Sequence, residues 1–292
     1  MTAAAAIAIG GCGLQTQAGA GAVRVTVTGD FGARPLGSAT VARLAAGATA
    51  LAVLQRKFTV SVGPRNSVRA IDGVAASGNF VRWALYLNGI AVGPRTRVHA
   101  GDKVWWDLEH SRGRPRAAVG SFPEPFVHGL AGKRYPTTLE CAGDVQAACR
   151  RVAAVLGRAG VAASGQALGT GSGQDSLTVV VGTWRDIRPA VAAALIAQGP
   201  ASSGVFARFT GARATALELL DKRGSPVSTL HAGAGLIAAL TQGGAPPTWL
   251  LVGTDVAGVD AAAKALRDGA LRGHIALAVS GGRDLPLPRS ER

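Results

Sequence analysis

The stretch from Phe80 to Glu109 constrains the fold more than any other part of this sequence. Aromatic residues make up only 5% of the chain, yet this stretch holds a cluster of large rings, Trp83, Tyr86, Trp105 and Trp106. Asn88-Gly89 and Gly101-Asp102 contain residue types that tolerate a positive φ, so both pairs predict tight turns. We therefore predict strands over 80–88 and 103–109, joined through these turns.

The same stretch resembles a known family. The residues that carry the resemblance are Trp83, Tyr86, Asn88, Gly89, Gly101, Asp102, Val104 and Trp106. At these positions the sequence is similar to the small β-grasp domains like the C-terminal domain of transcobalamin and intrinsic factor, which also occur in bacterial surface proteins of unassigned function. The resemblance covers residues 22–110. It implies a β-grasp (ubiquitin-like) fold and capture of a corrinoid or similar cobalamin-like ligand, which the mammalian proteins clamp against a helical barrel.

The periodicity of the residues before this stretch predicts a compatible order of elements. Residues 23–28 alternate apolar and polar side chains, which predicts a half-buried strand, and a second strand around 37–44 would complete a hairpin. Thr49 is a suitable N-cap for a single helix that runs to about residue 58. A further strand is expected near 67–72. A hairpin, one helix and then more strands is the order of a β-grasp domain.

A chain of 292 residues is long enough for two hydrophobic cores, because one core rarely organises more than about 250 residues. We expect a tether at 1–21, the β-grasp domain at 22–110, a connector rich in Pro and Arg at 111–140, an α/β domain at 141–285 and a tail at 286–292. The prolines of the connector predict that neither a helix nor a central strand persists there. Its Phe122, Phe126 and Tyr135 predict that it packs against a domain.

The C-terminal half contains two similar strand-helix-strand units. Their predicted elements lie at 177–183, 187–197 and 205–209, and again at 249–253, 259–266 and 274–279. Repeated units of this kind predict an α/β domain. Between them we expect a strand at 217–220 and an alanine-rich helix near 234–241. The predicted fold class is therefore α+β, an N-terminal β-grasp domain followed by an α/β domain with two repeats.

The three cysteines divide into one near the N-terminus and two in the middle of the chain. Cys12 follows Gly10-Gly11 in a stretch that resembles a bacterial lipobox, which implies lipidation of Cys12 and a membrane anchor. Residues 1–11 are shorter than a full signal-peptide apolar region and carry no basic segment. Either the natural start lies within a longer signal peptide, or the Gly-Gly-Cys sequence is coincidental.

Cys141 and Cys149 lie around the start of a helix expected at 144–156. A disulfide between them would connect the leading loop to the second turn of that helix, and it would require an oxidising compartment. The alternatives are two buried thiols, or a catalytic or metal-binding pair. The spacing is not C-x-x-C, and no nearby histidine pair completes a zinc site.

The formal charge of +14 favours an anionic partner, such as a wall polymer or lipid headgroups. The basic residues are scattered, and no helix carries a one-sided basic stripe, which disfavours nucleic acid.

The sequence shows no convincing catalytic constellation. Its five histidines accompany no G-x-S-x-G element, and no His, Asp and Glu cluster has metal-ligand spacing. Thr183 with Asp186, and Thr254 with Asp255, could hold an anion at a helix N-terminus, but these residues are also ordinary N-caps. We predict no catalytic residue, no metal and no cofactor other than the cobalamin-like ligand that the resemblance implies.

The candidate ligand-binding residues are Trp83, Tyr86, Asn88, Arg95, Arg97, Trp105 and Trp106. Residues of opposite parity in a strand face opposite sides of a sheet. One ring of each pair, Trp83 with Tyr86 and Trp105 with Trp106, should therefore enter the core. The other ring is available to a ligand, and the two arginines offer guanidinium groups.

We expect an exported, lipid-anchored binding protein at the cell membrane of a bacterium, which captures a corrinoid-like ligand for an uptake transporter. One alternative is an envelope adaptor or structural lipoprotein that binds an anionic polymer or a partner protein, and another is an extracytoplasmic enzyme. A ligand-binding protein should show a cleft between its domains lined by Trp or Tyr and by Arg. An adaptor should show a broad basic face, and an enzyme a cleft with a histidine or carboxylate at its floor.

Overall fold

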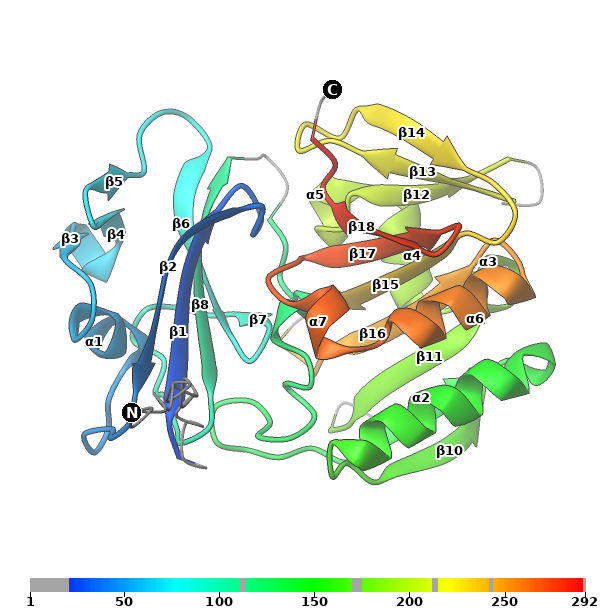
Figure 1. The fold of residues 1–292 in the computed structure, drawn as a ribbon, viewed down its shortest axis with the longest axis horizontal. Helices are drawn as coiled ribbons and strands as arrows, with labels where there is room; N and C mark the ends of the chain where they lie inside the picture. Colours follow the sequence, from blue (N-terminus) through cyan, green and yellow to red (C-terminus); the bar gives the residue numbers. More distant parts are fainter. Residues whose placement is uncertain (1–20, 111–113, 170–174, 212–214, 242–243, 291–292) are drawn as a thin grey trace, which may run out of the picture.

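The computed structural model describes residues 21–110, 114–169, 175–211, 215–241 and 244–290. Strands account for 39% and helices for 22%, so the fold is mixed α/β with strands predominating. Two modules lie side by side, an N-terminal module (residues 21–110) and a C-terminal module (residues 137–290), and each has its own main sheet (Figure 1).

The N-terminal module contains a mixed five-stranded sheet. In spatial order its strands are β2 (Arg34–Val41), β1 (Val23–Gly29), β8 (Lys103–His110), β6 (Val81–Leu87) and β7 (Ile90–Ala91). β1 and β8 are parallel, and the other neighbours are antiparallel. A smaller sheet contains β3 (Val60–Val62), β4 (Val68–Ile71) and β5 (Val74–Ala75), with a 3-10 turn η1 (Pro64–Asn66).

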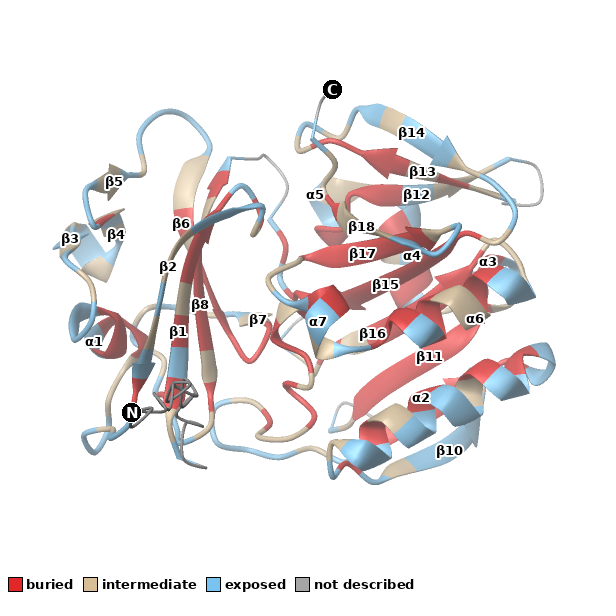
Figure 2. Cartoon of the chain, in the orientation of Figure 1, coloured by how far each residue is buried: buried red, intermediate tan, exposed pale blue. Residues whose placement is uncertain are grey.

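Helix α1 (Ala50–Gln55) covers one face of the five-stranded sheet. The Thr49 side chain accepts a hydrogen bond from the N–H of Ala52 at 3.3 Å, so the predicted helix and its cap are confirmed. Trp83 and Trp106 pack with Leu54 of this helix in the hydrophobic core between α1 and the sheet. Tyr86 and Trp105 point to the opposite face of the sheet. The two rings of each pair therefore face opposite sides of the sheet, as predicted. The expectation that the second ring stays available to a ligand is wrong, because Tyr86 and Trp105 are 0% and 3% exposed and pack in a cluster with residues of the C-terminal module. Figure 2 shows that the sheet is buried along its centre.

The C-terminal module is built on a seven-stranded sheet. In spatial order its strands are β10 (Ala163–Ala167), β9 (Thr137–Cys141), β11 (Leu177–Thr183), β16 (Thr248–Gly253), β15 (Gly235–Leu240), β17 (Ala276–Ser280) and β18 (Arg283–Leu287). The first four are parallel, and β15 is antiparallel to both of its neighbours.

Helices cover both faces of this sheet. The helices that pack on one face are α2 (Gln146–Arg158), preceded by η3 (Gly143–Val145), α6 (Val256–Ala265) and α7 (Asp268–Leu271). The other face carries α3 (Trp184–Ile187), α4 (Val191–Ala197), α5 (Pro200–Ser203) and a three-stranded sheet of β12 (Ala207–Thr210), β13 (Ala216–Leu220) and β14 (Pro226–Leu230). Among the described residues, every helix is too short or too polar to span a lipid bilayer.

Two predictions about this module are wrong. Residues 234–241 form no helix, because β15 occupies them and all six of its residues are buried between β16 and β17. A strand buried on both faces shows no alternation, so periodicity does not distinguish it from a buried helix. The range assigned to the connector also contains most of β9, which starts at Thr137 directly after Pro136. Because Pro136 precedes the strand, its missing N–H group removes no hydrogen bond from the β-ladder.

The predicted strand-helix-strand units occur in the expected order but are not equivalent. β17 joins the same sheet as β16, whereas β12 belongs to the separate three-stranded sheet. The helix predicted at 187–197 is divided into α3 and α4, with Pro189 between them. Asp255 caps α6 by accepting a hydrogen bond from the N–H of Gly258 at 2.8 Å, as an ordinary N-cap does.

The segment between the modules is hydrogen-bonded to both of them through its 3-10 turn η2 (Val119–Ser121) and the residue before it. The N–H of Ala118 donates to the carbonyl of Gly89 at 2.8 Å, and the N–H of Val119 donates to the carbonyl of Ile275 at 3.1 Å. The rings of Phe122 and Phe126 pack against Trp249, with centroids 5.9 and 5.1 Å away. The prediction that this segment packs against a domain is confirmed.

Candidate functional site: a cleft between the modules

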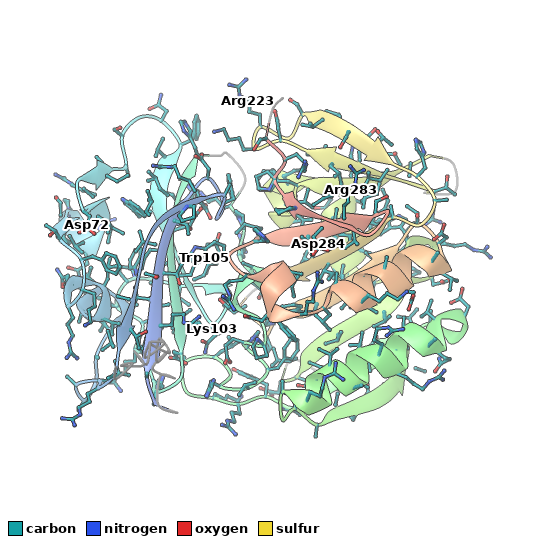
Figure 3. The ribbon with its side chains drawn as sticks, viewed as in Figure 1. Asp72, Lys103, Trp105, Arg223, Arg283 and Asp284 are labelled. Carbon is teal, nitrogen blue, oxygen red and sulfur yellow. A yellow bond between two sulfur atoms is a disulfide. The ribbon has the colours of Figure 1, made fainter. Side chains whose placement is uncertain are left out.

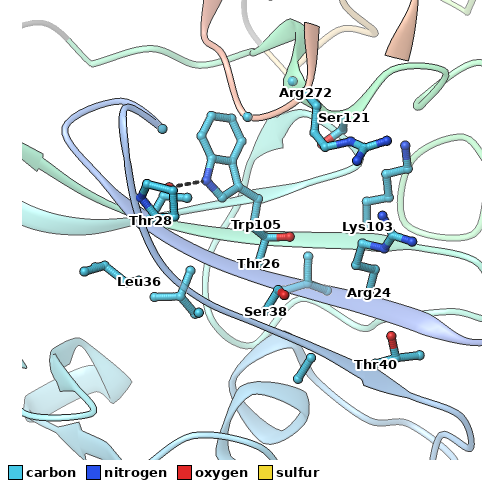
Figure 4. A pocket seen from close by; sticks show the side chains of 18 of the residues that line it. Arg24, Thr26, Thr28, Leu36, Ser38, Thr40, Lys103, Trp105, Ser121 and Arg272 are labelled. Atoms are coloured by element: carbon cyan, nitrogen blue, oxygen red, sulfur yellow. Dashed lines mark hydrogen bonds between the residues drawn. The ribbon is translucent and has the colours of Figure 1, made fainter. Parts of the chain in front are cut away.

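A cleft of about 800 Å³ lies between the N-terminal sheet and the C-terminal module. One wall is the face of β2, β1 and β8 that carries Arg24, Thr26 and Trp105, and the other consists of residues 120–121 and the segment around α7 (Figure 4). Figure 3 shows Lys103 and Trp105 at this boundary. Small-molecule sites commonly measure about 300–1,000 Å³, so the cleft is large enough for one.

The turn between β1 and β2 closes one end of the cleft. Asp107 accepts hydrogen bonds from the N–H groups of Phe31 at 2.9 Å and Gly32 at 3.0 Å, which fixes a turn whose residues have positive φ. The Phe31 ring packs edge-on against Phe206, with centroids 5.1 Å apart. A Cβ at residue 32 would lie 1.6 Å from the carbonyl oxygen of Gly273, so only glycine permits this close approach of the modules.

Three basic side chains from different elements line the other end of the cleft: Arg24 on β1, Lys103 on β8, and Arg272 after α7. The Lys103 ammonium donates to the carbonyl of Phe122 at 2.7 Å and to Asp268 at 3.4 Å, and Arg272 also pairs with Asp268. Burial lowers the pKa of Lys103, and the Asp268 charge opposes this shift. Arg24 forms no ion pair with any residue that the structure describes.

The predicted ligand-binding residues all lie in the described part of the chain, and of these only Trp105 lines the cleft. Its indole N–H donates to the Thr28 hydroxyl at 2.6 Å, and that hydroxyl donates to Asp107 at 2.6 Å. Burial raises the pKa of Asp107, while the hydrogen bonds from Thr28 and from the turn amides oppose the shift. Trp105 is only 3% exposed, so little of its ring is open to the cleft.

A second polar network connects β8 to β6, next to the hydrophobic cluster that contains Tyr86 and residues of both modules. Glu109 accepts a hydrogen bond from Arg82 at 2.5 Å and another from the Tyr86 hydroxyl. Burial raises the pKa of Glu109 to about 7, although the Arg82 charge opposes the shift. Burial and the Glu109 charge also raise the pKa of Tyr86. The Glu109 carboxyl therefore titrates near neutral pH.

The other predicted aromatic residues do not line the cleft. Trp83 and Trp106 lie in the core beneath α1, and their indole N–H groups have no hydrogen-bond partner among the described residues. Tyr86 is fully buried against Trp105, with ring centroids 5.0 Å apart. The structure thus brings Tyr86 and Trp105 together and places the other two rings on the far side of the sheet.

The predicted polar residues also lie away from the cleft. The Asn88 amide is buried and donates to Asp102 at 2.8 Å and to the carbonyl of Gly129 at 2.9 Å, which fixes the end of β6. Arg95 and Arg97 are exposed in a loop that hydrogen-bonds to the start of α1, on the opposite face of the sheet.

Sequence reasoning missed Arg24, Lys103 and Arg272. For the first two, alternation along each strand was the available signal: it places Arg24 opposite the buried valines of β1, and Lys103 on the same face of β8 as Trp105. No signal in the sequence shows that this face meets the segment that carries Arg272.

The predicted disulfide is confirmed, because Cys141 and Cys149 are bonded with their Cα atoms 6.2 Å apart. The bond connects the last residue of β9 to the first turns of α2. Cys12 lies outside the described residues.

A second cavity of about 710 Å³ lies within the C-terminal module, between β11 and the segment that holds α3 and α4. The charged side chains that line it, as far as the structure describes them, are the carboxylates Glu140 and Asp186. This cavity therefore suits a different ligand chemistry from the basic cleft between the modules.

In the part of the chain that the structure describes, no group of three or more His, Cys, Asp or Glu side chains is placed to hold a metal ion. No family model matches the sequence, and no curated protein is significantly similar to it. The chemistry of the cleft itself is thus the basis for inferring a function.

Proposed function

We propose that this chain is a non-enzymatic ligand-binding protein that holds a small molecule in the cleft between its modules. The observation that carries the proposal is the cleft, which is bordered by Trp105 and by Arg24 and Arg272. This combination is the one expected of a ligand-binding protein. The carboxylate at the cleft, Asp268, is engaged by Lys103 and Arg272, which favours a binding role over a catalytic one.

The ligand that the sequence resemblance implies is a corrinoid or similar molecule. The N-terminal module runs from a hairpin through one helix to further strands, and this order supports the proposed β-grasp relationship. In this proposal the ligand lies against β2, β1 and β8, and the C-terminal module provides the opposite wall in place of a helical barrel.

The proposal places the protein outside the cytoplasm, tethered through a lipid on Cys12 and delivering its ligand to an uptake transporter. The Cys141–Cys149 disulfide supports this location, because such bonds persist in oxidising compartments and are rare in the cytosol.

Calorimetric titration of the full chain with cobalamin tests the proposal. Thr26 is half-buried on the cleft wall, so Thr26→Trp would fill the space that the ligand needs. We expect wild type to bind and Thr26→Trp to bind at least about tenfold more weakly, since a clash of this kind removes about 1.4 kcal/mol or more.

Ser61→Trp is the matched control, because Ser61 is exposed on β3 and does not line the cleft. Binding that Thr26→Trp leaves unchanged would place the ligand elsewhere. A lack of binding at high micromolar cobalamin would end the corrinoid assignment. In that case the net charge of +14 would favour the second candidate, an envelope adaptor for an anionic polymer.

A further inference from the structure

We infer that the ligand of the cleft carries a phosphoryl group, which Arg24, Lys103 and Arg272 hold at the basic end. This inference rests on the proposed ligand-binding function and adds the chemical class of the ligand. The three cations come from β1, from β8 and from the segment after α7, so the site exists only where the two modules meet.

The charge at this end matches a phosphate group better than a carboxylate. The three cations and the Asp268 carboxylate give the residues that line this end a net charge of +2, because Lys103 and Arg272 share that carboxylate and Arg24 forms no ion pair with a described residue. A phosphomonoester carries about −1.5 to −2 charge at pH 7, whereas a carboxylate carries one negative charge. A phosphomonoester would therefore neutralise the basic end almost completely.

The geometry prepares these groups for an anion. The bonds from Lys103 to Phe122 and Asp268 hold its ammonium at the cleft, so little side-chain entropy remains to be lost on binding. Arg24 and Lys103 are register partners on the adjacent strands β1 and β8, so their like charges lie side by side on one wall of the cleft, and the Arg24 charge contributes to lowering the pKa of Lys103. An anion between them would relieve this repulsion, and a guanidinium fork can donate two hydrogen bonds to phosphate oxygens.

The opposite end of the cleft is less polar. Leu36 and Trp105 line it, and Figure 4 shows both of them away from the side where Arg24 and Lys103 end. A ligand that fills the whole cleft therefore combines an apolar part with a phosphoryl group. The class of ligand that fits is an organic phosphate, and free inorganic phosphate would occupy only the basic end.

Calorimetric titrations with inorganic phosphate and with phenyl phosphate, at constant ionic strength, test this inference on the full chain. We expect phenyl phosphate to bind several-fold more tightly than inorganic phosphate, because its ring reaches the apolar end. Arg24→Gln and Arg272→Gln should each weaken phenyl phosphate binding about tenfold or more, since each removes a charge-assisted hydrogen bond. Arg158→Gln, on the exposed end of α2, is the control and should change nothing.

The outcomes separate this inference from the proposed function. If the two cleft variants bind phenyl phosphate as tightly as wild type, the phosphoryl assignment is wrong. If cobalamin binding is nevertheless lost in Thr26→Trp, the cleft still holds a ligand and only the phosphoryl assignment falls. Equal affinity for the two phosphates would overturn the organic class and leave inorganic phosphate as the ligand. If Thr26→Trp alters the binding of neither cobalamin nor phenyl phosphate, both proposals fail.

Discussion

Glu109 is a fully buried carboxyl on β8 whose ionisation links folding stability to pH. It accepts hydrogen bonds from Arg82 and Tyr86 on the neighbouring strand β6. Its pKa is raised from an ordinary value of 4.5 to about 7, chiefly by burial. The folded protein therefore retains a proton that the unfolded chain releases, and folding stability must fall as the pH rises between these two values.

Glu109→Gln should remove this dependence, because glutamine keeps the shape and stays neutral. The free energy of unfolding of wild type, minus that of the variant, should decrease by up to about 3 kcal/mol between pH 4.5 and pH 7. Urea unfolding at several pH values measures this difference. Glu218→Gln, whose carboxylate pairs with Arg208 near the surface, serves as the control. A difference that stays constant or grows with pH would contradict the burial argument.

Inference from single residues assigned the rings to the correct faces of the sheet, but it was wrong that one ring of each pair stays open to a ligand, and it missed the basic residues of the cleft. Parity placed Trp105 and Trp106 on opposite faces, and the structure agrees. The sequence could not show which face meets a second module, because that contact depends on packing between distant segments. Arg24 and Arg272 are far apart in sequence and line one cleft only after the modules have docked.

At the scale of single elements, the turn between β1 and β2 does most to fix the position of the cleft. Gly32 has a φ of +85° and approaches the backbone of Gly273 too closely for any side chain. Gly73, between β4 and β5, has a similar φ of +78°, but a Cβ added at this residue would have no neighbouring atom within 4 Å. Comparing substitutions at the two glycines therefore separates the free-energy cost of the backbone conformation from the cost of disrupting the contact between the modules.

Alanine at either glycine should cost about 1–2 kcal/mol, because an L-residue is strained in this conformation. Gly32→Ala should cost about 1–3 kcal/mol more, the typical penalty of overpacking, because the turn must move away from Gly273. Denaturant unfolding of both variants measures the two costs. Equal destabilisation by the two substitutions would show that the turn does not hold the modules together.

The elements that the sequence predicted well are those whose signals are local. α1 has its cap at Thr49, and β1 alternates as a half-buried strand should. β15 was mistaken for a helix because its apolar, alanine-rich run is consistent with either structure. Its pairing with β16 on one side and with β17 on the other makes this segment a strand. β9 was missed because the prolines before it obscured a short strand in the middle of the parallel part of the sheet.

At the scale of the whole molecule, the modules share one hydrophobic cluster. Phe31, Tyr86 and Trp105 of the N-terminal module pack in the same cluster as Phe206 and Leu219 of the C-terminal module. A cleft bordered by such a contact has walls fixed in position before a ligand arrives, and preorganised walls lower the entropic cost of binding. The sequence did not predict this shared cluster, because it joins side chains from segments that are far apart in the chain.

Hydrogen–deuterium exchange of the full chain, with and without saturating phenyl phosphate, tests the central claim most directly. The claim predicts slower exchange in peptides that cover Arg34–Val41 and residues 268–273, the two walls of the cleft. Exchange at β10 and β14, which lie at sheet edges away from the cleft lining, should stay unchanged. Unaltered exchange at both walls, or protection confined to α4 beside the second cavity, would contradict the claim that the cleft between the modules holds an organic phosphate.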